Sequence, residues 1–293
     1  MALGACGRNQ GPGRPPAVEE LEAALTPRTM AQALRKAGGG HFHAVVSMTI
    51  DTPAADGQPA LKDEVTTTTD LWMDGTGNYR LLETNDRDGG REIVLHGRQL
   101  AVALRYSRMI RRPMQEGEGA RFLEEALGGP IGAWAIARRF AEVARQEDAP
   151  AAPPPSDPNA PPPPPSPATF EVKRASEVQP VKGDFESGVP PLQRWRETVD
   201  VQALTGKVRL EGPTLLPAAV QMEAKFSLTR DGKPLTGMIR VDSKIQELGR
   251  VAAIEPPLAE ELPARQRTIL EERALLGPRT GGTEPARRPK AER

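Results

Sequence analysis

Apolar and polar residues alternate along residues 41–50, where the sequence reads HFHAVVSMTI. In a β-strand, successive side chains point to opposite faces, so strict alternation is typical of a strand that is buried on one face only. Val45 is the one apolar residue on the otherwise polar face. The segment therefore predicts a strand with one apolar face, formed by Phe42, Ala44, Val46, Met48 and Ile50.

Similar segments recur in two blocks separated by more than fifty residues. Turn residues such as Asp74-Gly75 and Asp231-Gly232 lie between neighbouring segments, which indicates hairpin connections and hence antiparallel pairing. The second block contains the most regular alternation, with Val220, Met222, Phe226 and Leu228 on its apolar side. The predicted strands cover residues 41–50, 64–73, 78–84, 91–95, 99–106, 108–112, 169–174, 195–201, 205–211, 220–229, 235–244 and 251–254.

Three segments have the period of a helix instead. Residues 18–37 carry an apolar stripe and are followed by three glycines. The stripe is interrupted at Thr26-Pro27, where Thr26 is the expected N-cap of a second helix and Pro27 its first residue. Residues 119–147 have a wide apolar arc that includes Trp134, Ala137 and Phe140, which predicts a buried helix lying against the sheet. A further helix is predicted over residues 263–276, ahead of a polar tail that we expect to be disordered.

The composition limits the class of protein. Lys+Arg and Asp+Glu each number 39, so no net charge favours binding to nucleic acid. No run of apolar residues approaches 18, which argues against a transmembrane helix. Residues 149–167 contain eleven prolines, and this predicts a polyproline II linker or surface insertion. The alternative is a proline-rich ligand for a partner protein.

Cys6, which is the single cysteine, follows Leu3-Gly4-Ala5, and this order is that of a bacterial lipobox. We expect Cys6 to carry a lipid, with residues 1–17 as lipobox and flexible tether; residues 7–17 span roughly 35 Å when extended. A lipoprotein signal also requires a basic and an apolar region upstream, so the sequence starts inside the signal peptide on this interpretation. The alternative is a cytosolic protein with an unmodified cysteine.

Catalytic chemistry has no clear signature here. The sequence contains no nucleophile elbow, phosphate loop or dinucleotide fingerprint, so we predict a non-enzymatic protein without a cofactor. His41 and His43 lie two residues apart on the polar face of one strand, but two ligands do not make a metal site. A third ligand, either His96 or an acid, would have to arrive from a neighbouring strand, so we predict no metal site. Arg105, Arg108, Arg111 and Arg112 form a basic cluster that either binds a phosphate or lipid headgroup or protects a sheet edge.

The layout resembles a known group of proteins. The lipobox, the tether, the N-terminal helix and a meander containing WMDGTGNYR at residues 72–80 are similar to the LolA and LolB type of lipoprotein carrier. They are also similar to the mycobacterial lipid-binding lipoproteins and to the RseB sensor domain. The segment LPAAVQMEAKF at residues 216–226 resembles the later strands of that fold.

The resemblance implies an α+β fold in which a curved, antiparallel and unclosed β-barrel, or half-barrel, has helices covering its concave face. Residues 18–257 would form this domain, interrupted by the proline-rich insertion at 149–167, and residues 258–293 would form the C-terminal helix and tail. The implied function is that of an envelope lipoprotein, anchored at the periplasmic face of a bacterial membrane, that binds or carries a lipid, a lipoprotein or another apolar ligand.

The cavity wall expected on this basis combines the apolar sides of two strands with one face of the long helix. It comprises Phe42, Ala44, Val46, Met48, Ile50, Trp134, Ala137, Phe140, Val220, Met222, Phe226 and Leu228. The alternative is a protein-binding or scaffolding module of the cell envelope, in which the same faces form a filled core and edge strands recruit a partner.

Overall fold

The structure is a computed structural model that describes residues 16–54, 59–146, 167–178, 199–211, 216–230 and 232–261. Several sequence-based predictions lie outside these residues: the lipidation of Cys6, the tether before residue 16, nearly all of the proline-rich segment, and the helix at 263–276.

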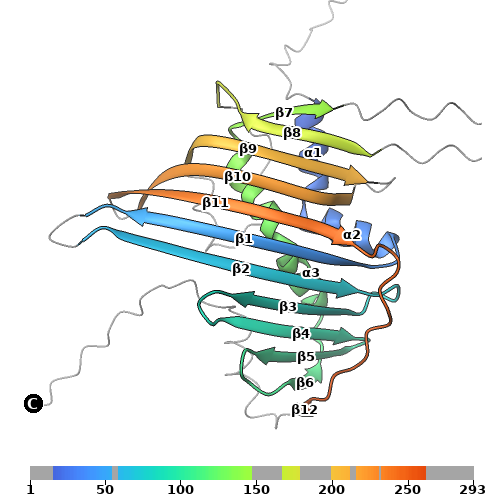
Figure 1. Ribbon diagram of the computed structural model, residues 1–293. Helices are drawn as coiled ribbons and strands as arrows, with labels where there is room; N and C mark the ends of the chain where they lie inside the picture. Colours follow the sequence, from blue (N-terminus) through green and yellow to red (C-terminus); the bar gives the residue numbers. More distant parts are fainter. Residues whose placement is uncertain are drawn as a thin grey trace, which may run out of the picture.

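One twelve-stranded sheet organises the described residues (Figure 1). Its spatial order is β12-β6-β5-β4-β3-β2-β1-β11-β10-β9-β8-β7. The strands are β1 Gly40–Thr52, β2 Leu61–Met73, β3 Tyr79–Asn85, β4 Gly90–His96, β5 Gln99–Leu104, β6 Ile110–Pro113, β7 Ala141–Gln146, β8 Ala168–Arg174, β9 Asp200–Glu211, β10 Leu216–Arg230, β11 Lys233–Gln246 and β12 Glu260–Glu261.

Strand β1 joins the two predicted blocks. On one side it pairs with β2, and on the other side it pairs with β11, antiparallel in both cases. All other pairs are antiparallel except β12 with β6. The sheet is open, because β12 and β7 lie at opposite ends of the order. The prediction of an α+β fold with an unclosed antiparallel sheet is confirmed.

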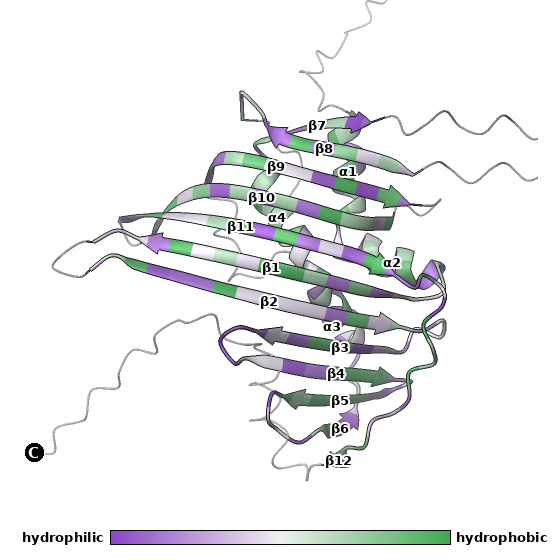
Figure 2. Cartoon of the chain, viewed as in Figure 1, coloured by the Kyte–Doolittle hydropathy of each residue, from purple (hydrophilic) through white to green (hydrophobic). Residues whose placement is uncertain are grey.

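Four helices accompany the sheet in the described part of the chain: α1 Pro16–Ala24, α2 Pro27–Lys36, α3 Glu118–Ala126 and α4 Gly128–Ala137. Thr26 caps α2 as predicted, since its hydroxyl oxygen accepts a hydrogen bond from the backbone N–H of Thr29 at 3.1 Å. In Figures 1 and 2 the helices lie behind the sheet, on one of its faces. No helix within the described residues has the length and apolar character needed to cross a membrane.

The core lies between these helices and the sheet, in two clusters. The first joins α1 and α4 to β7–β11 and contains Trp134, Phe170 and Phe226. The second joins α2 and α3 to β1–β5 and contains Phe42 and Tyr79. The alternating segments therefore bury their apolar sides under the helices, as the period-two pattern requires.

Three predicted features are wrong. The turn predicted between the strands 195–201 and 205–211 is absent, because residues 200–211 form the single strand β9. The helix predicted over 119–147 ends at Ala137, and residues 141–146 form β7 instead. There, Ala141 and Val143 are buried while Glu142 is exposed, so the two-residue period decides the structure once α4 has ended. Residues 251–254 form no strand; the backbone N–H of Ile254 instead donates to the Asp74 carboxylate at 3.0 Å.

Candidate functional site

The register of the central strands brings the predicted wall residues of β1 and β10 onto one face. On β11, Val241 lies between Val46 of β1 and Met222 of β10. Gly237 of β11 lies in the same way between Ile50 of β1 and Phe226 of β10. Trp134 and Ala137 on α4, and Phe140, which lies after α4 and not in a helix as predicted, belong to the same core cluster. The structure therefore gathers ten of the predicted wall residues in one cluster and places Phe42 and Ala44 in the adjacent one. The ten are Val46, Met48, Ile50, Trp134, Ala137, Phe140, Val220, Met222, Phe226 and Leu228.

Burial changes along this face. Phe42 and Ala44 are each 1% exposed, whereas Val46, Met48 and Ile50 on the same side of β1 are only partly buried. The change occurs beside the start of α4: a Cβ atom on Gly129, in the first turn of α4, would lie 2.9 Å from a methyl carbon of Val46. Figure 1 shows the ends of β1, β2, β10 and β11 extending past the helices.

We call this partly exposed area the outer wall. Phe226 forms its floor: Gly237 has no side chain, and a Cβ there would lie 2.6 Å from Cζ of Phe226 and 3.0 Å from Cδ1 of Ile50. The ring thus fills the space above β11 and makes a continuous apolar surface with Ile50. The outer wall consists of the partly buried residues Met48, Ile50, Val65, Leu228 and Leu235, with Phe226 beneath them.

The opposite face of β1 is polar. His41 Nε2 and His43 Nδ1 each lie 2.9 Å from the same oxygen of Asp70, on the neighbouring strand β2, and the His41 ring stacks on Trp72 with centroids 4.7 Å apart. His96 lies at the end of β4, away from this group. Asp70 is therefore the acid that reaches the histidine pair, and it acts as a shared hydrogen-bond acceptor of the two rings. Within the described ranges, no group of three or more His, Cys, Asp or Glu side chains is placed to hold a metal ion.

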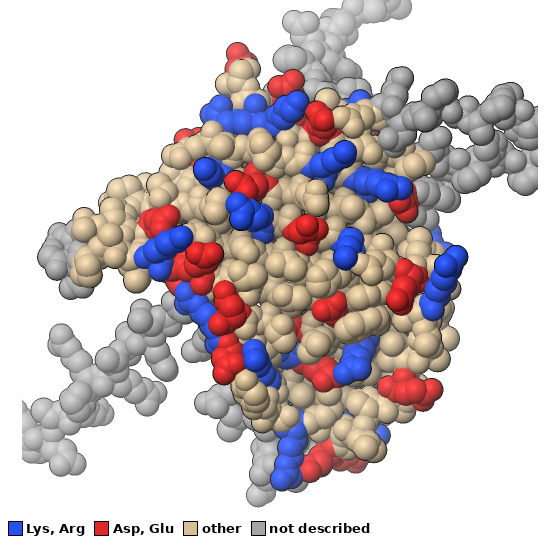
Figure 3. Space-filling view, in the orientation of Figure 1, with Lys and Arg blue, Asp and Glu red and all other residues tan. Residues whose placement is uncertain are grey.

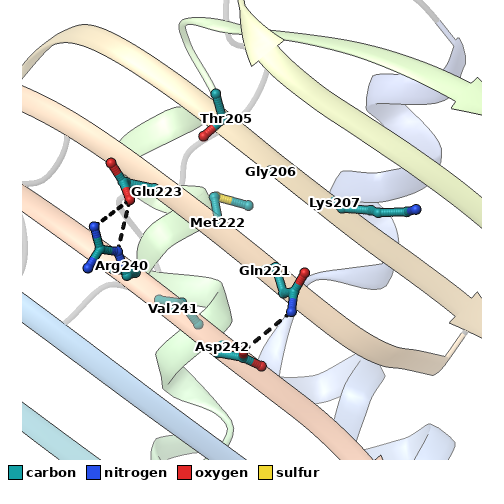
Figure 4. Close-up of a pocket in the computed structure, with 9 residues that line it drawn as sticks. All are labelled: Thr205, Gly206, Lys207, Gln221, Met222, Glu223, Arg240, Val241 and Asp242. Atoms are coloured by element: carbon teal, nitrogen blue, oxygen red, sulfur yellow. Dashed lines mark hydrogen bonds and ion pairs between the residues drawn. The ribbon is translucent and has the colours of Figure 1, made fainter.

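A shallow depression of about 340 Å³ lies on the polar face, over β9, β10 and β11 (Figure 4). Two charges on its rim form an ion pair, since Arg240 Nε donates to Glu223 at 2.8 Å, and the Gln221 amide donates to Asp242 at 3.3 Å. The two basic and two acidic residues of the rim balance in charge, so the depression has no net charge that favours a ligand of either sign. Its lining residues are Thr205, Gly206, Lys207, Gln221, Met222, Glu223, Arg240, Val241 and Asp242.

Two buried acids have clear structural roles that the sequence did not reveal. Burial acts to raise the pKa of Asp74, but hydrogen bonds from Ile254, Thr76 and Asn78 outweigh it and hold the pKa below its usual value. Glu118 behaves similarly. Burial acts to raise its pKa, but hydrogen bonds from Arg112 and the Gln115 backbone outweigh burial, so the pKa lies below its usual value. The available signal was the spacing Asp-x-Thr-x-Asn at 74–78, which is typical of a side-chain-capped turn.

The basic cluster is neutralised by carboxylates of the same chain. Arg105 pairs with Asp88, Arg108 with Glu260, Arg111 with Glu261 and Arg112 with Glu118. Three of these partners come from segments far away in the sequence or from the following helix, so the sequence alone did not identify them.

No protein-family model and no curated protein matches the chain. Among solved structures, a DUF1329 family protein from Desulfovibrio piger ATCC 29098 is 11% identical, with a TM-score of 0.20 over 78% of this chain and 92% of that protein. A beta-barrel-like protein of domain DUF1849 from Brucella abortus is 12% identical, with a TM-score of 0.21 over 69% of this chain and 97% of that protein. MucB is 12% identical, with a TM-score of 0.16 over 83% of this chain and 98% of its own length. TM-scores this low carry no argument about function.

Proposed function

We propose that this protein is a non-enzymatic binding protein of the bacterial envelope that holds an acyl chain of a lipid or lipoprotein on the outer wall. In this proposal the sheet is a half-barrel whose concave face carries the helices. One observation supports it above the others: the apolar face of β1 is fully buried at Phe42 and Ala44, and becomes partly exposed at Met48 and Ile50.

An acyl chain suits such a surface because its binding depends on buried area and not on precise polar contacts. Each buried methylene contributes about 0.8 kcal/mol, so a strip of aliphatic side chains is sufficient. Long, partly exposed aliphatic and methionine side chains also adapt to an irregular chain. Such side chains are present on three neighbouring strands: Met48 and Ile50 on β1, Leu235 on β11 and Leu228 on β10.

A second candidate is a protein-binding module with a filled core. It is favoured by the inner part of the predicted wall, since Trp134, Val220 and Phe226 are completely buried. In that case the outer wall is the margin of an ordinary core, and an apolar ligand does not bind there.

Localisation at the periplasmic face of a membrane, with a lipid on Cys6, belongs to the same proposal. It rests on the Leu3-Gly4-Ala5-Cys6 pattern in the sequence. Mass spectrometry of the protein purified from its native membrane is expected to show a diacylglyceryl group on Cys6. An unmodified Cys6 behind an intact Met1 contradicts the anchor and leaves ligand binding to be judged separately.

The binding proposal predicts opposite results for two neighbouring substitutions. Leu228→Asp places a carboxylate on the outer wall, and we expect it to weaken the binding of a fluorescent fatty acid by about tenfold or more, since desolvating the charge costs over 1.4 kcal/mol. Thr229→Asp is the matched control, because Thr229 is exposed on the opposite face of β10. The measurement is a fluorescence titration of each folded variant, checked by circular dichroism.

Three outcomes separate the candidates. Loss of binding in Leu228→Asp alone supports the proposal. Equal binding by both variants and the unaltered protein contradicts a ligand on the outer wall. If the unaltered protein neither binds the probe nor releases lipid on extraction, the filled-core module is favoured instead.

A further inference from the structure

In the part of the chain that the structure describes, a strand of two residues covers the edge of the sheet at β6. The covering strand β12 consists of Glu260 and Glu261, which pair in parallel with Ile110 and Arg111. On its other side β6 pairs with β5, where Arg112 lies opposite Leu100 and Pro113 lies opposite Gln99. A sheet edge presents unpaired backbone groups that accept another extended segment.

Two ion pairs accompany this short contact. Arg108 Nη1 lies 2.9 Å from Glu260 Oε1, and Arg111 Nη2 lies 3.4 Å from Glu261 Oε1. The side chains of Arg108 and Glu260 are 83% and 61% exposed, so water screens their attraction. Figure 3 shows basic and acidic side chains side by side at the lower end of the molecule, where Figure 1 places β6 and β12.

The segment that leads to β12 is anchored upstream of it. The Gly249 backbone N–H donates to the Gly39 carbonyl at 3.0 Å, and the Ile254 N–H donates to Asp74. Between Ile254 and Glu260 the side chains are mostly exposed, and Leu258 is fully exposed. Among the contacts of the described residues, release of β12 from the edge therefore breaks those of Glu260 and Glu261 and leaves the anchors at Asp74 and Gly39 intact.

We propose that the β6 edge, with Arg108 and Arg111, is a docking site for an extended segment of a partner protein that carries two adjacent carboxylates. The chain's own Glu260-Glu261 occupies this site in the absence of the partner and shows which chemistry the site recognises. Backbone pairing along Ile110 and Arg111 supplies the strand contact, and the two arginines select acidic side chains. This site is separate from the outer wall and does not depend on lipid binding.

Charge reversal in the full-length protein tests the site. The probes are two dye-labelled peptides: EPPLAEEL, the sequence of residues 255–262, and EPPLAKKL. Glu260→Lys with Glu261→Lys repels β12 from the arginines and frees the edge, so this variant is expected to bind EPPLAEEL at least about tenfold more tightly than the unaltered protein. Arg108→Glu with Arg111→Glu is expected to bind EPPLAKKL and to lose EPPLAEEL.

The control is Glu223→Lys with Asp242→Lys, which makes the same charge change on the polar face of β10 and β11, and which should bind EPPLAEEL like the unaltered protein. Fluorescence anisotropy gives the affinities. Equal affinity of the unaltered protein and the Glu260→Lys/Glu261→Lys variant for EPPLAEEL overturns the proposal. It is also overturned if the Arg108→Glu/Arg111→Glu variant prefers the same peptide as the unaltered protein. A concentration-dependent dimer of the unaltered protein that EPPLAEEL dissociates also overturns it, because the occupant is then β12 of a second copy.

Discussion

At the scale of single residues, the most consequential polar contacts are those buried beside α3. Arg112 and Glu118 are 8% and 4% exposed, and Arg112 Nη1 donates to Glu118 Oε2 at 2.7 Å. Removing one partner of such a pair leaves a buried charge without compensation, which costs about 3–5 kcal/mol. The pair also fixes the turn between β6 and α3, since the Gln115 backbone N–H donates to Glu118.

The lowered pKa of Glu118 predicts how stability depends on pH. Because the folded-state pKa lies below the ordinary value of 4.5, Glu118 stabilises the fold above that value, and this contribution is lost as the pH falls through the folded-state pKa. Glu118→Gln should lower the free energy of unfolding at pH 7 by about 3 kcal/mol and flatten the acid limb below pH 4.5. The exposed Glu116→Gln is the control. Urea unfolding at several pH values measures both effects, and an unaltered acid limb in Glu118→Gln contradicts the assignment.

Individual residue contacts were only partly predictable. The sequence showed that a third group near His41 and His43 must come from a neighbouring strand, and the register of β1 with β2 supplies Asp70. The sequence did not indicate the buried ion pair of Arg112 with Glu118, because the pair becomes buried only when α3 packs beside β6. Burial depends on the tertiary fold and not on the local pattern.

At the scale of elements, α4 determines where the covered part of the wall ends. Its residues are apolar on all sides, and it packs against β1, β9, β10 and β11. Both of its first residues are glycines, but they have different surroundings. A Cβ on Gly128 would meet no atom within 4 Å, whereas a Cβ on Gly129 would lie 2.9 Å from Val46.

This difference predicts opposite effects of the same substitution at adjacent positions. Gly128→Ala should stabilise the protein by up to about 1 kcal/mol, through the higher helix propensity of alanine. Gly129→Ala should destabilise it by about 1–3 kcal/mol, because its methyl group forces α4 away from Val46. Denaturant unfolding of the two variants measures the difference. Equal stability of the two variants contradicts the close approach of α4 to β1.

Elements with a long, regular pattern were predictable, and short ones were not. β1 and β10 alternate over ten or more residues and were located correctly from the sequence. β7 was assigned to a helix because Ala141, Val143 and Ala144 suit either period over six residues. The contact of β12 with β6 joins residues about 150 positions apart, and two glutamates carry no strand signal of their own.

At the scale of the whole molecule, the pairing of β1 with β11 holds the two blocks together. The pairing runs from His41 opposite Gln246 to Asp51 opposite Thr236, so the sheet is continuous where the sequence suggests two separate meanders. The order of strands was not predictable, because alternation identifies a buried face without identifying its neighbour. The core clusters cross the same boundary, since Val46, Met48 and Ile50 of β1 pack against the cluster of β7–β11.

A continuous sheet predicts that both blocks unfold in a single transition. Trp72 lies on β2 in the first block, and Trp134 lies on α4 over the second. The third tryptophan, Trp195, is replaced by Phe in both variants, so that each retains one tryptophan and reports on one block. Urea midpoints followed by fluorescence in Trp72→Phe and Trp134→Phe should coincide with the circular dichroism midpoint of the same variant.

The pairing of β1 with β11 is tested by Val241→Pro. Val241 lies between Val46 and Met222, and proline removes its backbone donor in the middle of the sheet. Since β11 supplies Ile239 and Val241 to the core of the second block and is the strand that pairs with β1, we expect this substitution to cost about 3 kcal/mol or more and to shift the fluorescence and circular dichroism transitions together. Glu142→Pro makes the same change in the edge strand β7 and should affect stability less. Two separated transitions in Val241→Pro would show instead that each block folds independently, and the sheet would then belong to two domains that share an edge.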